Sequence, residues 1–425
     1  MLVTVFLCFF LLLIMGMPIA LMLAATTGIA LFSHTSTSLL VLPQQLFNAL
    51  DNSVLLAIPF FIIAGGIMTE GAMARRLIAV INAFVAPYPG GLAVATTVGC
   101  LFFAALSGSS PATVVAIGSV MIPALIKAGY DDRFATGLVT SAGSLGIVIP
   151  PSIPMILYCM VMNVSVAELF MAGILPGLLI GGSFVAYVIV MAYRQRWFMG
   201  ERISWKETFQ CLRDGIWGIM LPVIVLGGIY SGMFTPTEAA GVSVVYALFV
   251  EVVIHREIRW QDVPKVCKQG AILSSCLLFI LACAMALVWL LTSERLPHLL
   301  ADSITAHVHS PWLFLILVNI LFLVMGTVME NVSAMLILSP LFVETLNRFG
   351  IDFIHYGIIM VLVIEFGFLT PPFGLNLFVA MGLTQKSLVE VSRGVLPFLV
   401  LLLGCLMLVT FIPQISLYLP VKFLR

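Results

Sequence analysis

Two related stretches decide the fold of this chain: Gly146-Ile-Val-Ile-Pro-Pro-Ser-Ile-Pro154 and Gly367-Phe-Leu-Thr-Pro-Pro-Phe-Gly-Leu-Asn376. Each lies inside a long apolar segment that would otherwise form a continuous helix. Proline removes a backbone N–H donor and clashes with the preceding helical turn, and glycine admits a sharp turn. The Pro-Pro pairs therefore predict two broken helices, at matching places in the two halves of the chain.

The segments around these breaks are uncharged over lengths that are typical of membrane proteins. Hydrophobic residues make up 62% of the 425 residues and charged residues 9%, against roughly 45 to 50% and about 25% in a soluble domain. Residues 1–50 carry no charge, and neither do the runs from Arg76 to Lys127 and from Arg133 to Glu168. Because ~20 apolar residues cross a bilayer, the chain is predicted to be an all-α polytopic membrane protein in the lipid bilayer. The composition excludes a soluble fold and a nucleic-acid binder, which needs clustered positive charge.

The two breaks belong to an internal repeat. A shift of 221 residues matches Gly and Pro positions, which chance rarely aligns because each fixes local backbone geometry. The matched pairs include Gly129 with Gly350, Asp131 with Asp352, Gly146 with Gly367, Pro150 with Pro371, Gly173 with Gly394 and Pro176 with Pro397.

The repeat predicts the organisation of the chain. We expect N-terminal helical scaffold at 1–50, a first repeat at 51–194, loops and a linking helix pair at 195–267, a second repeat at 268–413 and a tail at 414–425. Each repeat would contain a scaffold helix, a hairpin and a broken helix, the latter at 134–163 and 353–383. The number of crossings within 1–50 stays open, since Gly16-Met17-Pro18 fits either a kink or a gap between two helices.

The positions of Lys and Arg predict that the two repeats are inverted. A polar segment interrupts a long apolar one in each repeat, at Ser107-Gly-Ser-Ser-Pro111 and at Met325-Gly-Thr-Val-Met-Glu-Asn-Val-Ser333, which indicates two re-entrant hairpins. With these hairpins, 15 of the 19 basic residues lie on one side of the membrane; the exceptions are Arg295, Arg348, Lys422 and Arg425. That side is the cytoplasm by the positive-inside rule. The alternative is that the choice of hairpins itself produced the asymmetry.

The helix interruptions are the candidate functional sites. Inverted repeats with broken helices are typical of secondary transporters, which bind substrate and ions at the repeat interface. Carbonyl groups freed at a break can ligate a hard cation, and the N-terminus of the next half-helix favours an anionic carboxylate. A single kink or close packing of small residues would explain any one motif alone. The predicted substrate contacts are Ser110, Thr113, Pro151, Ser152, Asn331, Ser333, Pro372 and Asn376.

Three acidic residues lie near the interruptions. Glu330, in the second hairpin tip, either ligates a cation, carries a proton or is held by the N–H groups of its own loop. We expect Glu365 to support the second break structurally, and Glu238 to cap a helix that begins near Thr235. Since the sequence contains neither an HExxH pair nor a Walker A motif, it is not expected to be an enzyme, and an ion gradient would drive transport.

Four runs of the sequence resemble the large permease subunit of tripartite ATP-independent periplasmic (TRAP) transporters. They are Leu106-Ser-Gly-Ser-Ser-Pro-Ala-Thr-Val-Val-Ala-Ile-Gly118, Ser144-Leu-Gly-Ile-Val-Ile-Pro-Pro-Ser152, Gly228-Ile-Tyr-Ser-Gly-Met-Phe-Thr-Pro-Thr-Glu-Ala-Ala240 and Leu369-Thr-Pro-Pro-Phe-Gly-Leu-Asn-Leu-Phe378. The likeness covers essentially the whole chain. It implies an elevator-type ion transporter fold in the bacterial inner membrane, two or more Na⁺ as coupling ions, a small four-helix membrane subunit and a periplasmic substrate-binding protein.

The resemblance also implies two Na⁺ sites and a substrate class. The first site would comprise Ser107, Ser109, Ser110, Gly146, Val148 and Ile149, and the second Gly326, Thr327, Glu330, Asn331, Gly367 and Thr370. The two hairpin tips resemble those of the C4-dicarboxylate branch of the family more than those of the sialic-acid branch. Two positions depart from the family pattern: a more polar residue is expected in place of Ile364, and a smaller one in place of Phe366. The alternatives are a stand-alone Na⁺/dicarboxylate symporter, a TRAP permease for a sugar acid or sialic acid, and a passive channel.

Overall fold

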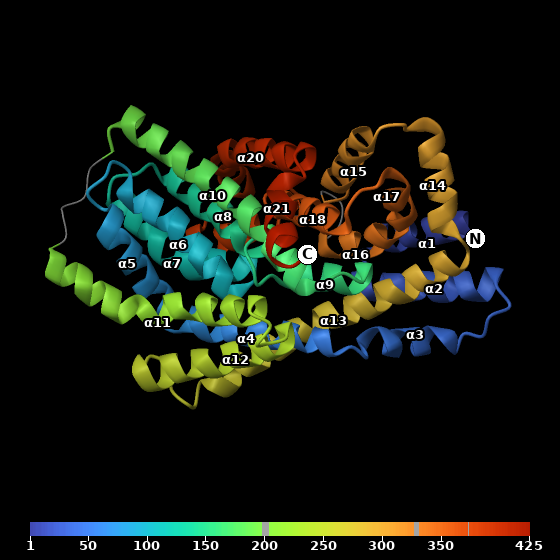
Figure 1. Ribbon diagram of the computed structural model, residues 1–425, viewed down its shortest axis with the longest axis horizontal. Helices are drawn as coiled ribbons and strands as arrows, with labels where there is room; N and C mark the ends of the chain where they lie inside the picture. The colour runs from blue at the N-terminus through green and yellow to red at the C-terminus, as the bar shows by residue number, and fades with distance from the viewer. Residues whose placement is uncertain (198–203, 327–330, 373) are drawn as a thin grey trace.

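The structure is a computed structural model that describes residues 1–197, 204–326, 331–372 and 374–425, with Leu2 and Asn331 described by their backbone alone. These residues form helices and connecting loops, and no strand occurs among them (Figure 1). Seven helices of the described residues are long and apolar enough to cross a membrane, or up to nine if each of two bent helix pairs is one span. The predicted all-α, multi-pass architecture is confirmed.

The N-terminal region consists of three helices, α1 (Leu2–Ile14), α2 (Ile19–His34) and α3 (Val41–Leu50). Gly16 adopts a left-handed conformation with φ +72°, and Pro18 precedes the first residue of α2. Both residues stop helix propagation for the reasons given above. Gly16-Met17-Pro18 therefore separates two helices rather than kinking one.

The same order of elements occurs twice. The first unit contains α4 (Ala57–Glu70), α5 (Met73–Val85), α6 (Gly91–Ser107), α7 (Ser110–Lys127), α8 (Asp132–Ser144), α9 (Ile153–Met162) and α10 (Val166–Gln195). The second contains α13 (Val263–Ser293), α14 (Leu296–His307), α15 (Pro311–Met325), α16 (Asn331–Leu341), α17 (Val343–Phe349), α18 (Phe353–Phe368), α19 (Leu375–Thr384) and α20 (Leu388–Phe411). Helices α11 (Trp205–Tyr230) and α12 (Pro236–Leu248), with a π-helical turn at Phe249–Ile254, link the units, and α21 (Gln414–Phe423) ends the chain.

The contacts between the two units are reciprocal, as an approximate two-fold axis requires. Helix α7 packs against α19 while its counterpart α16 packs against α9, the counterpart of α19. Likewise α8 packs against α20, and α18 packs against α10. Ser144 and Glu365, which are 221 residues apart and thus equivalent, hydrogen-bond to each other at 2.7 Å. This contact places both residues at the axis.

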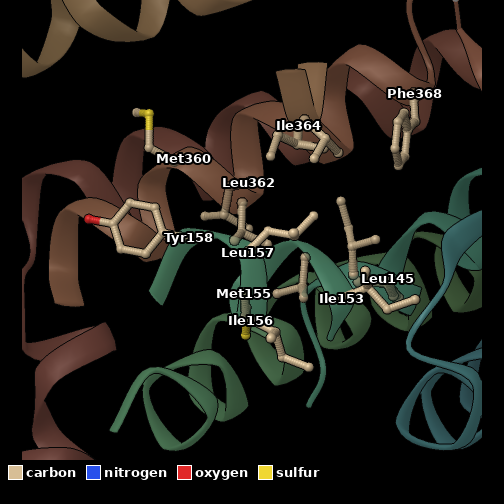
Figure 2. Packing of buried hydrophobic residues seen from close by; sticks show 14 of the residues in the cluster. Leu145, Ile153, Met155, Ile156, Leu157, Tyr158, Met360, Leu362, Ile364 and Phe368 are labelled. Carbon is tan, nitrogen blue, oxygen red and sulfur yellow. The ribbon is translucent and has the colours of Figure 1, made fainter. Parts of the chain in front are cut away.

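A buried apolar layer lies where the two units cross. Leu157 of α9 and Leu362 of α18 meet between the two helices (Figure 2), and both are almost fully buried. Gly357 of α18 allows this approach, because a Cβ atom there would lie 2.5 Å from the Tyr158 ring. The Tyr158 hydroxyl donates to the Phe353 carbonyl at 2.7 Å.

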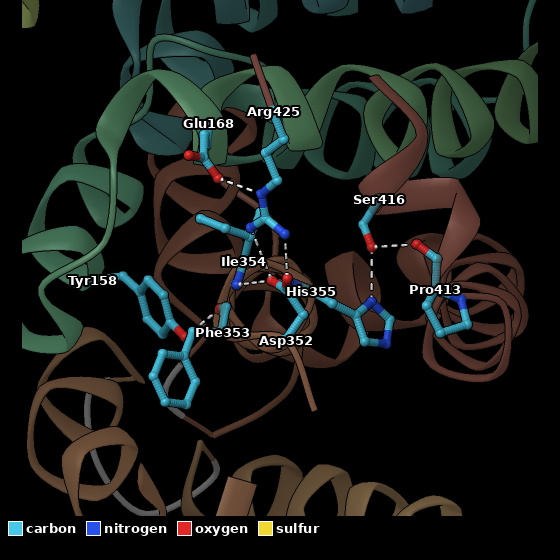
Figure 3. A network of polar contacts seen from close by, with 9 residues as sticks. All are labelled: Tyr158, Glu168, Asp352, Phe353, Ile354, His355, Pro413, Ser416 and Arg425. Atoms are coloured by element: carbon cyan, nitrogen blue, oxygen red, sulfur yellow. Dashed lines mark hydrogen bonds and ion pairs between the residues drawn. The ribbon is translucent and has the colours of Figure 1, made fainter. Parts of the chain in front are cut away.

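The last residue of the chain ties the units together on the surface. The guanidinium of Arg425 pairs with Glu168 at the start of α10 at 2.9 Å and with Asp352 before α18 at 2.5 Å (Figure 3). The Asp352 carboxylate also accepts from the Ile354 N–H at 2.7 Å, which caps α18. Partial burial raises the pKa of Asp352, but Arg425 and the Ile354 N–H outweigh it and hold that pKa below its usual range. The C-terminal residues are therefore an integral part of the fold.

Candidate ion and substrate site

The tip of the first hairpin lies against the first broken helix. Gly108, with φ +58°, turns the chain between α6 and α7. Its carbonyl accepts a hydrogen bond from the Ile153 N–H, at the start of α9, at 3.3 Å. Gly146 lies so close to the tip that an added Cβ atom would be 2.8 Å from the Ser109 carbonyl oxygen and 2.9 Å from the Ser110 nitrogen. The predicted proximity of tip and break is thus observed.

The polar groups of this first site are partly satisfied by one another. The Ser107 and Thr113 hydroxyls are 2.9 Å apart, and Thr113 donates to the Ser109 carbonyl at 2.9 Å. Across the break, the Ser152 hydroxyl donates to the Ile147 carbonyl at 2.6 Å. Within the described parts of the chain, the carbonyls of Val148 and Ile149 accept no backbone hydrogen bond. Backbone oxygen atoms of this kind are ligands that a hard cation prefers. The Val148 oxygen packs against Gly173 of α10, where an added Cβ atom would lie 2.6 Å away.

A contact between the repeats brings together two predicted substrate residues. The Asn376 amide, in the first turn of α19, donates to the Ser110 hydroxyl, at the start of α7, at 2.6 Å. Both side chains are fully buried, and Asn376 Oδ1 has no hydrogen-bond partner among the described residues. Because Ile153 is also bonded to the tip, the N-termini of α7, α9 and α19 converge here. Three converging helix N-termini favour a negatively charged group.

The second site is described in part. Thr327, Glu330 and the side chain of Asn331 lie outside the described residues, so their predicted roles stay predictions. Gly326 ends α15, and Ser333 is buried in α16. The Thr370 hydroxyl donates to the Phe366 carbonyl at 2.8 Å. Gly367 lies in the last turn of α18, and the Pro371-Pro372 bond is cis, as is Pro150-Pro151 in the first unit.

A cavity of about 250 Å³ adjoins the first hairpin tip. Ser107 and Ser109 form one wall, Gly65 and Thr69 of α4 a second, and Gln269 of α13 a third. The cavity thus reaches the first tip between α4 and α13, and Gly65 of α4 allows the close approach of Ser107.

The acidic residues named from the sequence have different surroundings. Glu238 forms the capping box with Thr235: the Thr235 N–H donates to the carboxylate at 2.8 Å and the Glu238 N–H donates to the Thr235 hydroxyl at 3.3 Å. The predicted capping role is confirmed. Glu365 is fully buried behind the second break and is bonded to Ser144, the geometry expected of a supporting role.

Sequence reasoning missed one buried acid, Glu251. Its carboxylate accepts from the N–H groups of Ala72 at 3.1 Å and Met73 at 2.8 Å, and so caps α5 from a different helix. His255, one turn later, contacts the same carboxylate at 3.3 Å. The signal in the sequence was a glutamate in the apolar run Phe249–Ile254, four residues before a histidine.

Known proteins resemble this chain over nearly its whole length. The sequence model of the family described as "Tripartite ATP-independent periplasmic transporter, DctM component" matches residues 6–415. The C4-dicarboxylate TRAP transporter large permease protein DctM of Pseudomonas aeruginosa is 45% identical over 398 residues, 94% of this chain and 93% of that protein. The protein of the same name from Rhodobacter capsulatus is 41% identical over 424 residues, 96% of each.

A solved structure, that of the Alcanivorax borkumensis YdaH transporter, aligns with a TM-score of 0.60 over 87% of this chain and 86% of that one. Its sequence identity is 16%, so the likeness concerns the fold alone. The family match and the close relatives are decisive for membership. The chain belongs to the DctM family of TRAP transporter large permeases, a family of transporters rather than enzymes, and is a multi-pass protein of the bacterial inner membrane.

Proposed function

We propose that this permease imports a C4-dicarboxylate together with Na⁺. The observation that carries the proposal is the contact of Ser110 with Asn376 where three helix N-termini converge. The carbonyls of Val148 and Ile149, which accept no backbone hydrogen bond from a described residue, belong to the adjoining break. The helix N-termini suit a carboxylate and the carbonyls suit a hard cation. The relatives from Pseudomonas and Rhodobacter are named for C4-dicarboxylates, which supports the substrate class.

We propose that the permease works with two partner proteins. A small membrane subunit would complete the membrane unit, and a periplasmic binding protein would deliver the substrate, as the family description "tripartite" and "periplasmic" indicates. The hairpins and broken helices would move together past α4 and α13 as an elevator. The alternatives are a stand-alone symporter and a permease for another carboxylate.

Reconstitution of the permease with its small subunit in liposomes tests the proposal. Addition of the binding protein loaded with radiolabelled succinate should give accumulation that requires an inward Na⁺ gradient and ceases when K⁺ replaces Na⁺. A dianion moving with two Na⁺ is electroneutral, whereas a third Na⁺ would add about 2.3 kcal/mol per 100 mV of membrane potential. Uptake by the permease alone would reject the tripartite mechanism, and equilibration without accumulation would indicate a channel.

Two substitutions test the ion sites separately. Ser109→Ala, in the first tip, and Asn331→Ala, in the second, should each raise the Na⁺ concentration required for half-maximal uptake. Unchanged Na⁺ dependence in both variants would reject the assignment of the two sites, even if succinate is transported.

A further inference from the structure

A second cavity lies far from the hairpin tip of the first unit, between the N-terminal helix and the second hairpin. Its volume is about 560 Å³. Helices α1, α13, α15 and α16 form its walls, and they gather at the end of the molecule that holds the N-terminus (Figure 1). Every described side chain that lines it is apolar, so it cannot belong to the polar ion and substrate site.

The cavity opens toward the membrane and closes against the interior. Val3 and Phe6 of α1 line it and have 71% and 62% of their surfaces exposed, so the cavity is open on this side. Ala334 and Ile337 of α16 and Leu287 of α13 form its buried wall. In a membrane-spanning protein, exposed apolar side chains face lipid hydrocarbon. The mouth therefore opens sideways into the bilayer.

The apolar walls determine what fills the space. Water would find no polar partner there, and a polar or charged solute would lose its hydration without compensation. An empty space would deprive the lining side chains of dispersion contacts. The hydrocarbon chain of a lipid contacts such walls favourably, and the bilayer supplies it wherever the cavity is open to the membrane.

An exposed cation next to the apolar wall fits the two parts of a phospholipid. Leu296 lines the wall, and the residue before it, Arg295, is exposed and forms no ion pair with any residue in the described ranges. Met325, the last residue of α15, also lines the wall. A guanidinium forms strong bonds with a phosphate group.

We propose that this cavity is a phospholipid site, in which one acyl chain fills the space between α1 and the second hairpin and the phosphate binds Arg295. The bound chain contacts both arms of the hairpin, through Leu321 of α15 and Ile337 of α16. It thereby supports the hairpin along both of its arms. This role does not depend on which solute the permease carries.

Photolabelling of the reconstituted complex tests the site. The permease and its small subunit are placed in liposomes of phosphatidylethanolamine and phosphatidylglycerol that contain phosphatidylethanolamine with a diazirine at the end of one acyl chain. After irradiation, mass spectrometry should find adducts on Phe6 and Ile337, and these should survive a chase with unlabelled lipid. Adducts on Leu317, which is 46% exposed on the outer face of α15 and lies outside the cavity, should disappear in the chase.

Matched variants distinguish the cavity from the general lipid surface. Ala334→Phe places a phenyl ring in the buried wall of the cavity and should reduce Ile337 labelling, because the acyl chain must compete with the ring for space. Leu317→Phe places the same side chain outside the cavity and should leave that labelling unchanged. Native mass spectrometry should show less retained phospholipid for Arg295→Gln than for the control Lys422→Gln.

The wild-type label map is sufficient to overturn the proposal even if a variant fails to fold. Absence of label at Ile337, or label there that the chase removes as fast as at Leu317, would reject a bound lipid. Label that appears at Ile337 only when the small subunit is omitted would assign the cavity to that subunit and would likewise overturn the proposal.

Discussion

Gly146→Ala should damage the first ion site by steric displacement of the hairpin tip. The added Cβ atom would lie 2.8 Å from the Ser109 carbonyl oxygen and 2.9 Å from the Ser110 nitrogen, whereas ordinary contacts are 3.4–4 Å. Both neighbours are backbone atoms, so a rotamer change cannot relieve the overlap. The tip must move by roughly half an ångström, and overpacking of this kind costs about 1 to 3 kcal/mol.

The cost should appear in the Na⁺ dependence of transport. If this free-energy cost destabilises the Na⁺-bound state, the Na⁺ concentration for half-maximal uptake should rise about 5- to 150-fold, since 1.4 kcal/mol is a factor of ten in an equilibrium constant. The assay is succinate uptake into proteoliposomes across a Na⁺ titration, together with the Na⁺-induced rise in melting temperature of the purified protein. The second measurement requires no transport and detects a folded variant that has lost Na⁺ affinity.

Gly182→Ala is the matched control. Gly182 lies inside α10 with nothing within 4 Å of an added Cβ atom, so alanine should leave Na⁺ dependence unchanged and stabilise the helix by about 0.5 to 1 kcal/mol. A Gly146→Ala variant with normal Na⁺ dependence and a normal Na⁺-induced melting shift would refute the reasoning. It would show that the contact of the break with the tip does not control ion binding.

Three further substitutions test the contacts that hold the fold. Glu251→Ala leaves two buried N–H groups unpaired and should lower the free energy of unfolding by about 2 to 4 kcal/mol. The control Glu257→Ala removes an exposed ion pair, in which 40% of the Glu257 side chain is accessible, and should lower it by at most about 1 kcal/mol. Melting curves of the two variants measure the difference. Arg425→Gln should lower the melting temperature at pH 7 by the equivalent of at most about 1 kcal/mol. Because the pKa of Asp352 is lowered in the folded protein, this difference should be present above its unfolded pKa of about 4 and vanish as the pH falls further; a constant difference down to pH 3 would contradict it. Tyr158→Phe should cost about 1 kcal/mol, the net value of one hydrogen bond, and an unchanged melting temperature would show that this bond contributes nothing.

The sequence was sufficient to predict the features that depend on local backbone chemistry. Gly108 and Pro111 end one helix and begin the next, so the first hairpin tip follows from residue types alone. The Gly and Pro positions of the repeat reveal its period for the same reason. The capping box of Thr235 and Glu238 is likewise a pattern of neighbours.

The remaining features depend on packing between distant segments. The Ser110–Asn376 contact joins residues 266 apart, and the cap that Glu251 provides to Met73 spans 178 residues. No local pattern specifies which faces of two helices will meet. The helix α21 was also missed as structure, because it is held by packing against α10 and by the contact of Ser416 with His355 at 2.7 Å, 61 residues away.

The hydrogen bond between Ser144 and Glu365 bears on why the two units share one chain. In a symmetric dimer of identical subunits, a residue at the axis faces its own copy. Two glutamates there would repel each other, and two serines lack the reach of the longer side chain. Fusion of the units removes this restriction, because the residues on either side of the axis can then change independently. At this position the halves touch as equivalents, and a duplicated chain has there an option that a dimer lacks: a donor facing an acceptor.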